Sequence, residues 1–397
     1  MQRIEISPGI YWVGAVDWDV RTFHGAHHAT EMGTTYNAYL IDDDKVTLVD
    51  TVHRKFTQEM VERISDILDP SEIDYIVANH GEPDHSGSIP EALEFAPNAT
   101  VLCSKMGERS LEGQFGGDLR LRTVGNGEEV SIGDRTLHFI EARMLHWPDS
   151  MFTYLPEERI LLSNDAFGQH LASNKRFDDQ VDHCDLMKEA RTYYANILNP
   201  YSKLVERKIS EIQESGLEIG MIAPAHGIIW RNDPGKIIQA YLDWATGKAG
   251  EGRVIVAYET MWGGTENMAR RIVEGLSDAG LEVKMQRLSA THRSEVIAEL
   301  LEAKGVIIGS STLNKGVLPQ VAELLSEIKG LEFGDRIGGA FGCYGWGGGA
   351  TKVIAQTLEE TGIEMPIDPV RVNWYPDEDD LERCYRYGKD FADKLRS

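Results

Sequence analysis

Cysteine is scarce in this sequence of 397 residues, and its spacing excludes several kinds of site. The four cysteines stand far apart, at Cys103, Cys184, Cys343 and Cys384, and no C-x-x-C pair occurs. The sequence therefore predicts neither a disulfide framework nor an iron or zinc site built from thiolates. This usage indicates a reducing compartment, and we expect a cytoplasmic protein.

Positive charge and long apolar stretches are also scarce. The 40 Lys and Arg are outnumbered by 64 Asp and Glu, which gives a formal net charge of −24. A surface of that sign repels nucleic acid and anionic membranes, so neither is expected as a partner. No apolar run approaches the roughly 18 residues of a membrane span. The first residues lack the basic and apolar regions of a signal peptide.

Metal-binding residue types are concentrated in residues 79–87, which read NHGEPDHSG. The apolar residues 73–78 before them predict a buried strand, and the glycine, serine and proline that follow are loop and helix-start signals. If the segment is extended, alternate positions point the same way, so His80, Glu82 and Asp84 converge on one point. This pattern predicts a metal site at the exit of a strand. The alternative is a polar loop with two solvated histidines.

Three later apolar runs deliver one further histidine or acid each. Residues 136–140 precede a strand end at His146, residues 159–164 lead to Asp165, and residues 221–225 lead to His226. A single such residue is commonly structural. Four strand ends that each offer a histidine or carboxylate favour a metal centre, carried by the loops of a layered α/β domain.

The last third of the chain restarts after a linker. Residues 246–252 are small, polar and rich in glycine, a linker signal, and residues 253–258 then form a β-branched strand. The loop 259–267 opens a predicted helix at 268–279. Such a loop, rich in hydroxyls and glycine and placed between a strand and a helix start, cradles phosphate with backbone N–H groups. It contains no Lys or Arg, which excludes the P-loop pattern of nucleoside triphosphatases.

Two further loops support a cofactor site in this region. Strand 305–310 leads into residues 311–315, and strand 337–342 leads into residues 343–349. Both loops follow strands of a predicted doubly wound parallel sheet, whose carboxyl ends bind ligands. Their glycines let the backbone approach a flat ring, and Trp262 and Trp346 are candidates to stack on it. The alternative for the last loop is an ordinary glycine-rich turn.

The order H-x-E-x-D-H at residues 80–85, followed by His146, Asp165 and His226, resembles the metallo-β-lactamase fold, a four-layer αββα sandwich with a two-metal site. Hydrolases of that fold usually carry a second histidine where Glu82 stands. With Glu82, the pattern resembles the flavodiiron proteins (A-type flavoproteins). Hard oxygen donors stabilise Fe³⁺, so a carboxylate-richer set suits iron. The loops of the last third resemble the FMN loops of flavodoxins.

This resemblance covers essentially the whole chain and implies its organisation. Residues 1–249 would form the metallo-β-lactamase-like diiron domain, and residues 250–397 a flavodoxin-like domain that binds FMN. His80, Glu82 and His146 would hold one iron, Asp84 and His226 the other, and Asp165 would bridge them. His85 is expected as a further ligand, although some members of the family leave the corresponding histidine uncoordinated.

The FMN contacts are likewise implied by the resemblance. The expected residues, from three loops, are Thr260, Met261, Trp262, Gly263, Gly264, Thr265, Ser311, Thr312, Leu313, Asn314, Tyr344, Gly345, Trp346, Gly347 and Gly348.

No catalytic residue is expected beyond the metal ligands. A hydroxyl near the metals is expected from Tyr193 or Tyr194, with a place in the core as the alternative. Outer or solvated roles are expected for some of the other histidines, His24, His27 and His28. Purely structural roles are expected for the rest, His53, His138, His170, His183 and His292.

The resemblance implies reduction of O₂ to water at the diiron centre with electrons passed through FMN, and reduction of NO to N₂O is the alternative. Because the chain ends soon after the flavodoxin-like region without a C-x-x-C pair for an appended rubredoxin, we expect an external donor, either rubredoxin or reduced coenzyme F420. A head-to-tail homodimer or a dimer of dimers is also implied.

Two other classes remain as alternatives. The first is a zinc hydrolase with a fused flavodoxin, which would need the usual histidine in place of Glu82. The second is a pure electron carrier with a vestigial metal site. Both are disfavoured because every expected iron-ligand position is filled.

Overall fold

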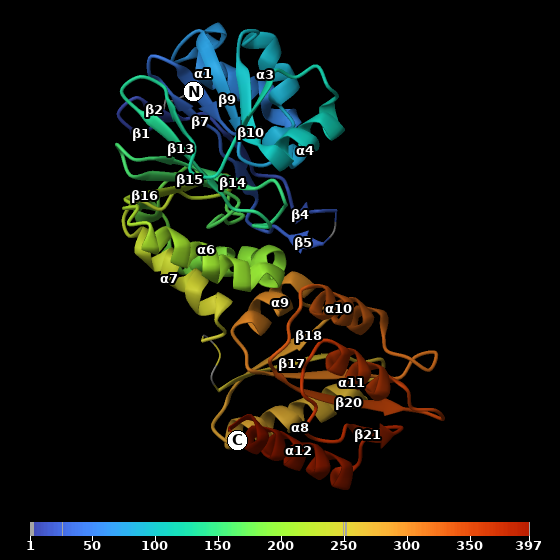
Figure 1. Ribbon diagram of the computed structural model, residues 1–397. Coiled ribbons are helices and arrows are strands. Elements are labelled where there is room, and N and C mark those ends of the chain that lie inside the picture. Colours follow the sequence, from blue (N-terminus) through green and yellow to red (C-terminus); the bar gives the residue numbers. More distant parts are fainter. Residues whose placement is uncertain (1–3, 26, 249, 251, 397) are drawn as a thin grey trace. The chain divides into compact units, whose positions relative to one another are not determined.

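The computed structural model describes residues 4–25, 27–248, 250 and 252–396, which form two compact units. The first unit is built from the chain up to Tyr193 and from Tyr201–Leu242. The second takes in the chain from Asp243 onward, together with the short segments His27–Ala29 and Tyr194–Pro200. The predicted boundary between residues 249 and 250 falls at Ala249, which lies outside the described residues, so this boundary stays a prediction. Figure 1 follows the chain in colour.

Two sheets form the middle of the first unit. The first sheet has the order β1-β2-β7-β8-β9-β10-β11. Its strands are β1 (Ile4–Ser7), β2 (Ile10–Trp12), β7 (Tyr39–Ile41), β8 (Val46–Val49), β9 (Ile73–Ala78), β10 (Thr100–Ser104) and β11 (Leu121–Val124). The pairs up to β7–β8 are antiparallel, and those from β8 to β11 are parallel.

The second sheet has the order β12-β13-β14-β15-β16. Its strands are β12 (Glu129–Ser131), β13 (Thr136–Glu141), β14 (Met151–Leu155), β15 (Ile160–Asn164) and β16 (Met221–Pro224). The pairs are antiparallel until the last, because β16 runs parallel to β15. Parallel pairing places the carboxyl ends of β15 and β16 side by side, and both strands lead into predicted site residues.

The core of this unit lies between the sheets and on their outer faces. Trp12 and Val77 of the first sheet pack with Phe139 and Leu162 of the second in one cluster of buried side chains. A second cluster covers the other face of the first sheet, where α1 (Thr57–Ser65) turns Met60 and Ile64 inward with a helical period.

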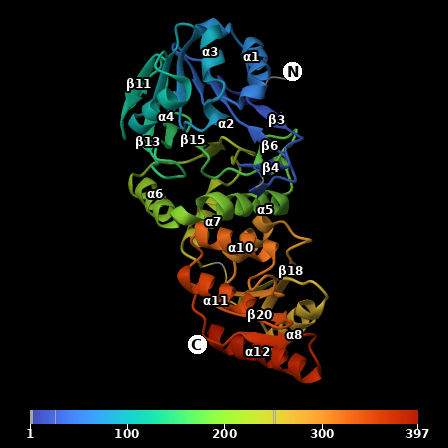
Figure 2. The same ribbon diagram turned by 90° about the vertical axis from the view of Figure 1, so that its right-hand side faces the viewer.

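Helices cover both outer faces of the paired sheets. α3 (Ile89–Phe95) and α4 (Lys105–Phe115) lie with α1 over the first sheet, and α5 (His183–Tyr193) and α6 (Ser202–Glu214) lie beyond the second (Figures 1 and 2). The αββα order predicted for this part of the chain is confirmed.

The second unit contains a parallel sheet with the order β18-β17-β19-β20-β21. Its strands are β17 (Arg253–Glu259), β18 (Glu282–Arg287), β19 (Gly305–Ser310), β20 (Ile337–Tyr344) and β21 (Val370–Asn373). The strand order reverses beside β17, so the crevice at the carboxyl ends of β17 and β19 is the place where such folds bind ligands. The predicted doubly wound sheet is confirmed.

Helices lie on both faces of this sheet (Figure 1). α8 (Gly264–Asp278) and α12 (Glu378–Arg396) pack with β17 and β20 in one buried cluster. The other connections are α9 (Arg293–Leu301), α10 (Pro319–Gly330) and α11 (Ala350–Glu360). The predicted helix start at residue 268 is too late, because α8 begins at Gly264 directly after the left-handed Gly263, which has φ +85°.

The described part of the chain contains no helix that combines the length and the apolar character needed to span a membrane. All four cysteines are free, and Cys184 is the exposed one. The absence of disulfides among these residues agrees with the prediction from cysteine spacing.

Glycine permits α8 and α12 to approach at backbone distance. A Cβ added at Gly275 would lie 2.1 Å from the carbonyl oxygen of Tyr385, and one at Gly388 would lie 2.3 Å from that of Ile272. Neither neighbour is a flexible side chain, so both glycines are required by the close approach and not by a special φ angle.

We expect Gly275→Ala to lower the free energy of unfolding of the second unit by about 1–3 kcal/mol, because the new methyl group overpacks the helix pair. Gly330→Ala is the matched control, since a Cβ at Gly330 meets nothing within 4 Å. The control should be neutral or stabilising by up to about 1 kcal/mol. Denaturant unfolding followed by circular dichroism compares them. Equal midpoints would show that the helices move apart at no cost.

Candidate functional site

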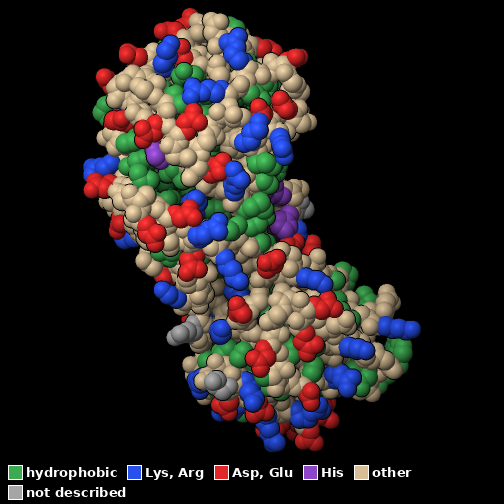
Figure 3. All heavy atoms as spheres, in the orientation of Figure 1, with side chains coloured by type: hydrophobic (Ala, Val, Ile, Leu, Met, Phe, Trp, Pro, Cys, Tyr) green, Lys and Arg blue, Asp and Glu red, His purple; other side chains and the backbone are tan. Residues whose placement is uncertain are grey.

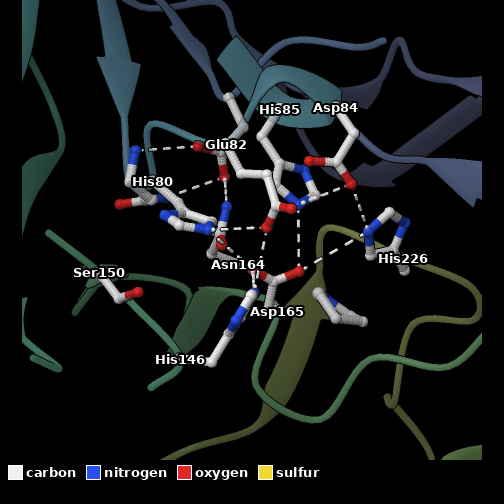
Figure 4. A network of polar contacts seen from close by, with 12 residues as sticks. His80, Glu82, Asp84, His85, His146, Ser150, Asn164, Asp165 and His226 are labelled. Atoms are coloured by element: carbon white, nitrogen blue, oxygen red, sulfur yellow. Dashed lines mark hydrogen bonds and ion pairs between the residues drawn. The ribbon is translucent and has the colours of Figure 1, made fainter. Parts of the chain in front are cut away.

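Seven histidine and carboxylate side chains of the first unit face one another in two groups (Figure 4). One group is His80, Glu82, His146 and Asp165, and the other is Asp84, His85 and His226. Within each group the potential ligand atoms all lie within 4.8 Å of one another. All seven predicted metal-type residues are therefore brought together.

The local fold explains why there are two groups instead of the single point expected from an extended segment. Pro83 starts a short helix, α2 (Pro83–Ser86), for which Glu82 is the N-cap residue. The helical turn carries Asp84 and His85 away from His80 and Glu82. The prediction that His80, Glu82 and Asp84 converge on one point is thus wrong.

The loops after β13, β15 and β16 carry the remaining members of the two ligand groups. Asp165 and His226 follow β15 and β16, as predicted. His146 does not stand at a strand end, because it lies inside the loop between β13 and β14, after Met144 in a left-handed conformation with φ 65°. The described residues with positive φ also include Asp50, Asn164 and Phe167. Such strained backbone is typical of functional loops that the surrounding structure holds in place.

Asp165 lies between the two groups. Its Oδ1 is 3.0 Å from Nε2 of His85 and 3.7 Å from Nε2 of His226. Its Oδ2 is 3.4 Å from Nε2 of His146 and 3.6 Å from Nε2 of His80. One carboxylate oxygen therefore faces each group, which is the arrangement of a bridging ligand.

The charge balance of the groups calls for cations. Burial lowers the pKa of His80, but hydrogen bonds to Asp149 and Glu82 outweigh it and raise the pKa to about 10. Burial likewise opposes the carboxylates of Asp165 and Glu82, yet the neighbouring imidazoles hold both pKa values below their ordinary range. A proton on His80 thus supplies positive charge that the carboxylates require and that metal ions would provide.

Buried polar atoms without hydrogen-bond partners fit the same conclusion. Oδ1 of Asp84, Oδ2 of Asp165 and Nδ1 of His85 are buried, and no described residue hydrogen-bonds to them. Oδ2 of Asp165 lies among the ligand-type nitrogens of His80 and His146 and would be satisfied by a metal ion. The donor set of imidazole and carboxylate suits iron.

Outer contacts orient several of these side chains. Nδ1 of His80 lies 3.1 Å from Oδ1 of Asp149, and Nδ1 of His226 lies 2.7 Å from the backbone oxygen of Thr35. The Tyr193 hydroxyl donates a 2.7 Å hydrogen bond to Oδ1 of Asp165. Of the two tyrosines considered, Tyr193 therefore supplies the hydroxyl, while Tyr194 packs against Trp244.

Two buried acids near the site were missed by the sequence prediction. Asp149 lies in the same loop as His146, and it also accepts the backbone N–H of Gly81 at 2.9 Å. Asp50 follows β8 and accepts hydrogen bonds from Asn79 and Asn164, the residues that directly precede His80 and Asp165. The signal was available, because residues 45–51 form a further apolar strand that ends in an acid.

The other histidines are not members of the two groups, although two of them contact members. Nε2 of His24 lies 3.0 Å from Oε1 of Glu82, and burial only partly offsets that hydrogen bond, so the pKa of His24 is raised. His27 pairs with Glu327 at 3.1 Å. His170, expected to be structural, faces His226 with ring centroids 5.1 Å apart.

A cavity of about 660 Å³ opens among the predicted flavin loops of the second unit. Ten of the expected residues line it, namely Met261, Trp262, Gly264, Ser311, Thr312, Asn314, Tyr344, Gly345, Trp346 and Gly347. Of the others, Thr260 and Thr265 shape the loops, because the Thr260 hydroxyl accepts the N–H of Gly263 and the Thr265 hydroxyl contacts that of Ser311. Gly263, Leu313 and Gly348 are not among the lining residues.

The cavity has four further lining residues, of which Lys315 and Cys343 belong to the predicted loops 311–315 and 343–349, whereas Trp374 and Tyr375 were missed. The available signal was β21, a further strand of the sheet, which leads directly into the aromatic pair Trp374 and Tyr375. Trp262 and Trp346 are 88% and 95% exposed, so their flat apolar rings are available for contact with a ligand or partner.

Comparisons with known proteins agree with this architecture. Residues 34–227 match the family model described as ODP family beta lactamase, and residues 256–388 match the flavodoxin family. A protein of Moorella thermoacetica named nitric oxide reductase is 50% identical over 396 residues, which is 99% of each chain.

Solved structures show the same likeness. The rubredoxin oxygen:oxidoreductase of Desulfovibrio gigas has a TM-score of 0.97 and 40% identity, covering 100% of this chain and 99% of that one. The flavodiiron protein of Giardia intestinalis has a TM-score of 0.96 and 35% identity, covering 100% and 97%. With both domains in the same order and these identities over the full length, the chain belongs to the flavodiiron protein family.

Proposed function

We propose that this protein is an oxidoreductase that reduces O₂ and NO at a diiron centre, with electrons delivered through FMN. The observation that carries the proposal is the position of Asp165, which faces both groups of ligand-type side chains. The resemblance found in the sequence favours O₂ as the main substrate, with NO as the alternative. Support for NO is equal, because a 50% identical relative is named nitric oxide reductase and a structural neighbour is named for oxygen.

The ligand assignment is part of this proposal. His80, Glu82 and His146 would hold one iron ion, and Asp84, His85 and His226 the other. Asp165 would bridge the two. Glu82 disfavours the zinc hydrolase alternative, because it places a carboxylate where such enzymes have an imidazole.

Two residues around these ligands orient them through hydrogen bonds. Asp149 accepts from His80, which fixes the ring so that Nε2 faces the ligand group. Tyr193 keeps its proton, because burial and the Asp165 carboxylate raise the pKa of its hydroxyl well above the ordinary value, so it stays a hydrogen-bond donor. When bound, the iron pair supplies electrons to O₂ or NO, and FMN passes electrons on one or two at a time.

The flavin would occupy the cavity of the second unit. The backbone from Thr260 to Gly263 precedes the N-terminus of α8, and this helix start favours a phosphate. The exposed faces of Trp262 and Trp346 offer stacking surfaces for the isoalloxazine.

The electron donor and the assembly are also proposed. Lys315 is the charged side chain among the residues that line the flavin cavity, and the whole chain carries a net charge of −24. An acidic donor would meet this lysine first, which suits rubredoxin or reduced F420. We further propose a head-to-tail homodimer, alone or paired into a dimer of dimers. Four free cysteines support a cytoplasmic location.

Asp165→Ala tests the diiron assignment. Because the substitution removes the oxygen that faces each group, we expect the variant to lose bound iron and to reduce O₂ and NO more than about 100-fold more slowly. FMN content should be unchanged. Asp118→Ala is the control, since Asp118 is exposed in the same unit. Gas consumption with iron analysis measures the effect, and retained turnover in Asp165→Ala would refute the assignment.

Asp149→Asn tests the outer support of His80. We expect about a 10- to 100-fold loss of iron affinity, because the amide no longer fixes the imidazole as a carboxylate does. Competition with a chelator measures the affinity, and Asp118→Asn serves as the matched control. An unchanged affinity would mean that the loop alone orients His80.

Stopped-flow reduction identifies the donor. The iron- and FMN-loaded protein is mixed anaerobically with reduced rubredoxin or with reduced F420, and flavin absorbance reports the rate. For the donor that works, Lys315→Glu should slow reduction about tenfold at low salt, with a difference that shrinks as salt rises. Lys389→Glu makes the same charge change outside the cavity. If both variants behave alike, Lys315 has no part in docking.

A further inference from the structure

The metal centre is reached from one side. The side chains of His80, His85, Asp165 and His226 are almost completely buried, whereas those of Glu82 and His146 are 14% and 11% exposed. On the Glu82 side lies a pocket of about 320 Å³, here called the Tyr36 pocket, whose floor contains Glu82 and Asp84.

The floor of this pocket joins the two ligand groups. Glu82 belongs to the group with His80 and His146, and Asp84 to the group with His85 and His226. A molecule that enters the pocket therefore arrives beside one ligand-type carboxylate of each group.

The rest of the pocket is lined by aromatic side chains together with Lys55, His53 and Pro83. Phe23, His24 and Tyr36 line it, and Val20 and Thr22 stand at its outer part, where Thr22 is exposed and Val20 half-buried. Figure 3 shows histidine side chains at the surface beside β4 (Thr22–Phe23). Lys55 lines the same pocket as the two carboxylates, so the pocket admits small uncharged molecules and a small anion such as azide alike.

Tyr36 is a polar residue of the pocket whose ring is held by neighbouring aromatic rings. Its ring is buried against Phe23, His53, Phe56 and His226, with centroid separations of 5.6–6.4 Å. The residue is only 3% exposed and no described residue hydrogen-bonds to its hydroxyl, yet this hydroxyl is not among the fully buried unpartnered polar atoms, so it is accessible from the pocket. A phenol at neutral pH carries its proton and is a donor.

We propose that the Tyr36 pocket is the route by which the diatomic substrate reaches the metal centre, and that the Tyr36 hydroxyl donates a hydrogen bond to the molecule that arrives there. The inference rests on the proposed function for the identity of the substrate. The route itself is a property of the pocket, so it extends to any small ligand of the metal centre.

Val20→Trp tests the route, because the indole would fill the outer part of the pocket. The probe is azide, added to the oxidised, iron-loaded protein and followed by absorbance, and the second measurement is reoxidation of the reduced protein by NO or O₂. We expect both second-order rate constants to fall at least about tenfold, with unchanged iron and FMN content. Asp19→Trp is the control, since Asp19 is exposed and does not line the pocket.

Tyr36→Phe tests the hydroxyl while it keeps the ring packing. We expect azide to associate at the wild-type rate but to bind about five- to tenfold more weakly, because the lost hydrogen bond speeds dissociation. A merely structural role of the hydroxyl would change stability or iron content and leave azide affinity unchanged.

The outcomes separate this inference from the proposed function. If Val20→Trp binds azide and reacts with the gases as fast as the wild type, the route is overturned. Wild-type azide affinity in Tyr36→Phe overturns the role of the hydroxyl. If Val20→Trp slows azide binding but neither wild type nor variant reacts with O₂ or NO, the route is supported and the proposed function fails.

Discussion

The attraction between Asp165 and the imidazoles around it is the interaction on which the first unit depends. A buried carboxylate is stable only when positive charge compensates it, and here histidines from three different loops stand within 3.7 Å of its two oxygens. Loops that follow β9, β13 and β16 are thereby drawn to the end of β15. The same shortage of positive charge that raises the pKa values of His80, His85 and His146 makes the cluster a cation site.

Holding so many polar groups without water requires a rigid frame. Asp50 provides part of it, since its carboxylate accepts hydrogen bonds from Asn79 and Asn164. Asn79 directly follows β9 of the first sheet and precedes His80. Asn164 is the last residue of β15 in the second sheet and precedes Asp165. Burial raises the pKa of Asp50, which shows that the frame itself costs electrostatic energy. That cost is consistent with a site selected for geometry above stability.

Sequence reasoning succeeded where the information was local. Strand ends that deliver His80, Asp165 and His226 were visible as apolar runs followed by one polar residue, and the flavin loops as glycine-rich strand exits. It failed where a local turn, or a residue far away in the sequence, decides where a side chain lies. Pro83 converts an extended segment into a helix and so separates Asp84 from Glu82.

The sequence prediction missed several residues for the same reason, because their roles depend on partners far away in the sequence. Asp149 becomes meaningful only when the loop after β13 folds back on His80, across 69 positions of sequence. Trp374 and Tyr375 join the flavin cavity because β21 lies beside β20, a pairing that no short motif encodes. Composition and spacing therefore determine the type of site, whereas the sheet order determines which outer residues belong to it.

The two sites differ in exposure, and this difference divides their tasks. Ligand-type side chains of the first unit are buried beside a pocket of about 320 Å³, which has room for small molecules only. The flavin cavity of the second unit is about twice as large and is bordered by tryptophans that are 88% and 95% exposed. Exposed aromatic surface of this kind is costly in water unless a partner covers it. Large electron donors therefore have a surface to meet at the flavin, while the metal centre is accessible to gases and closed to the donors themselves.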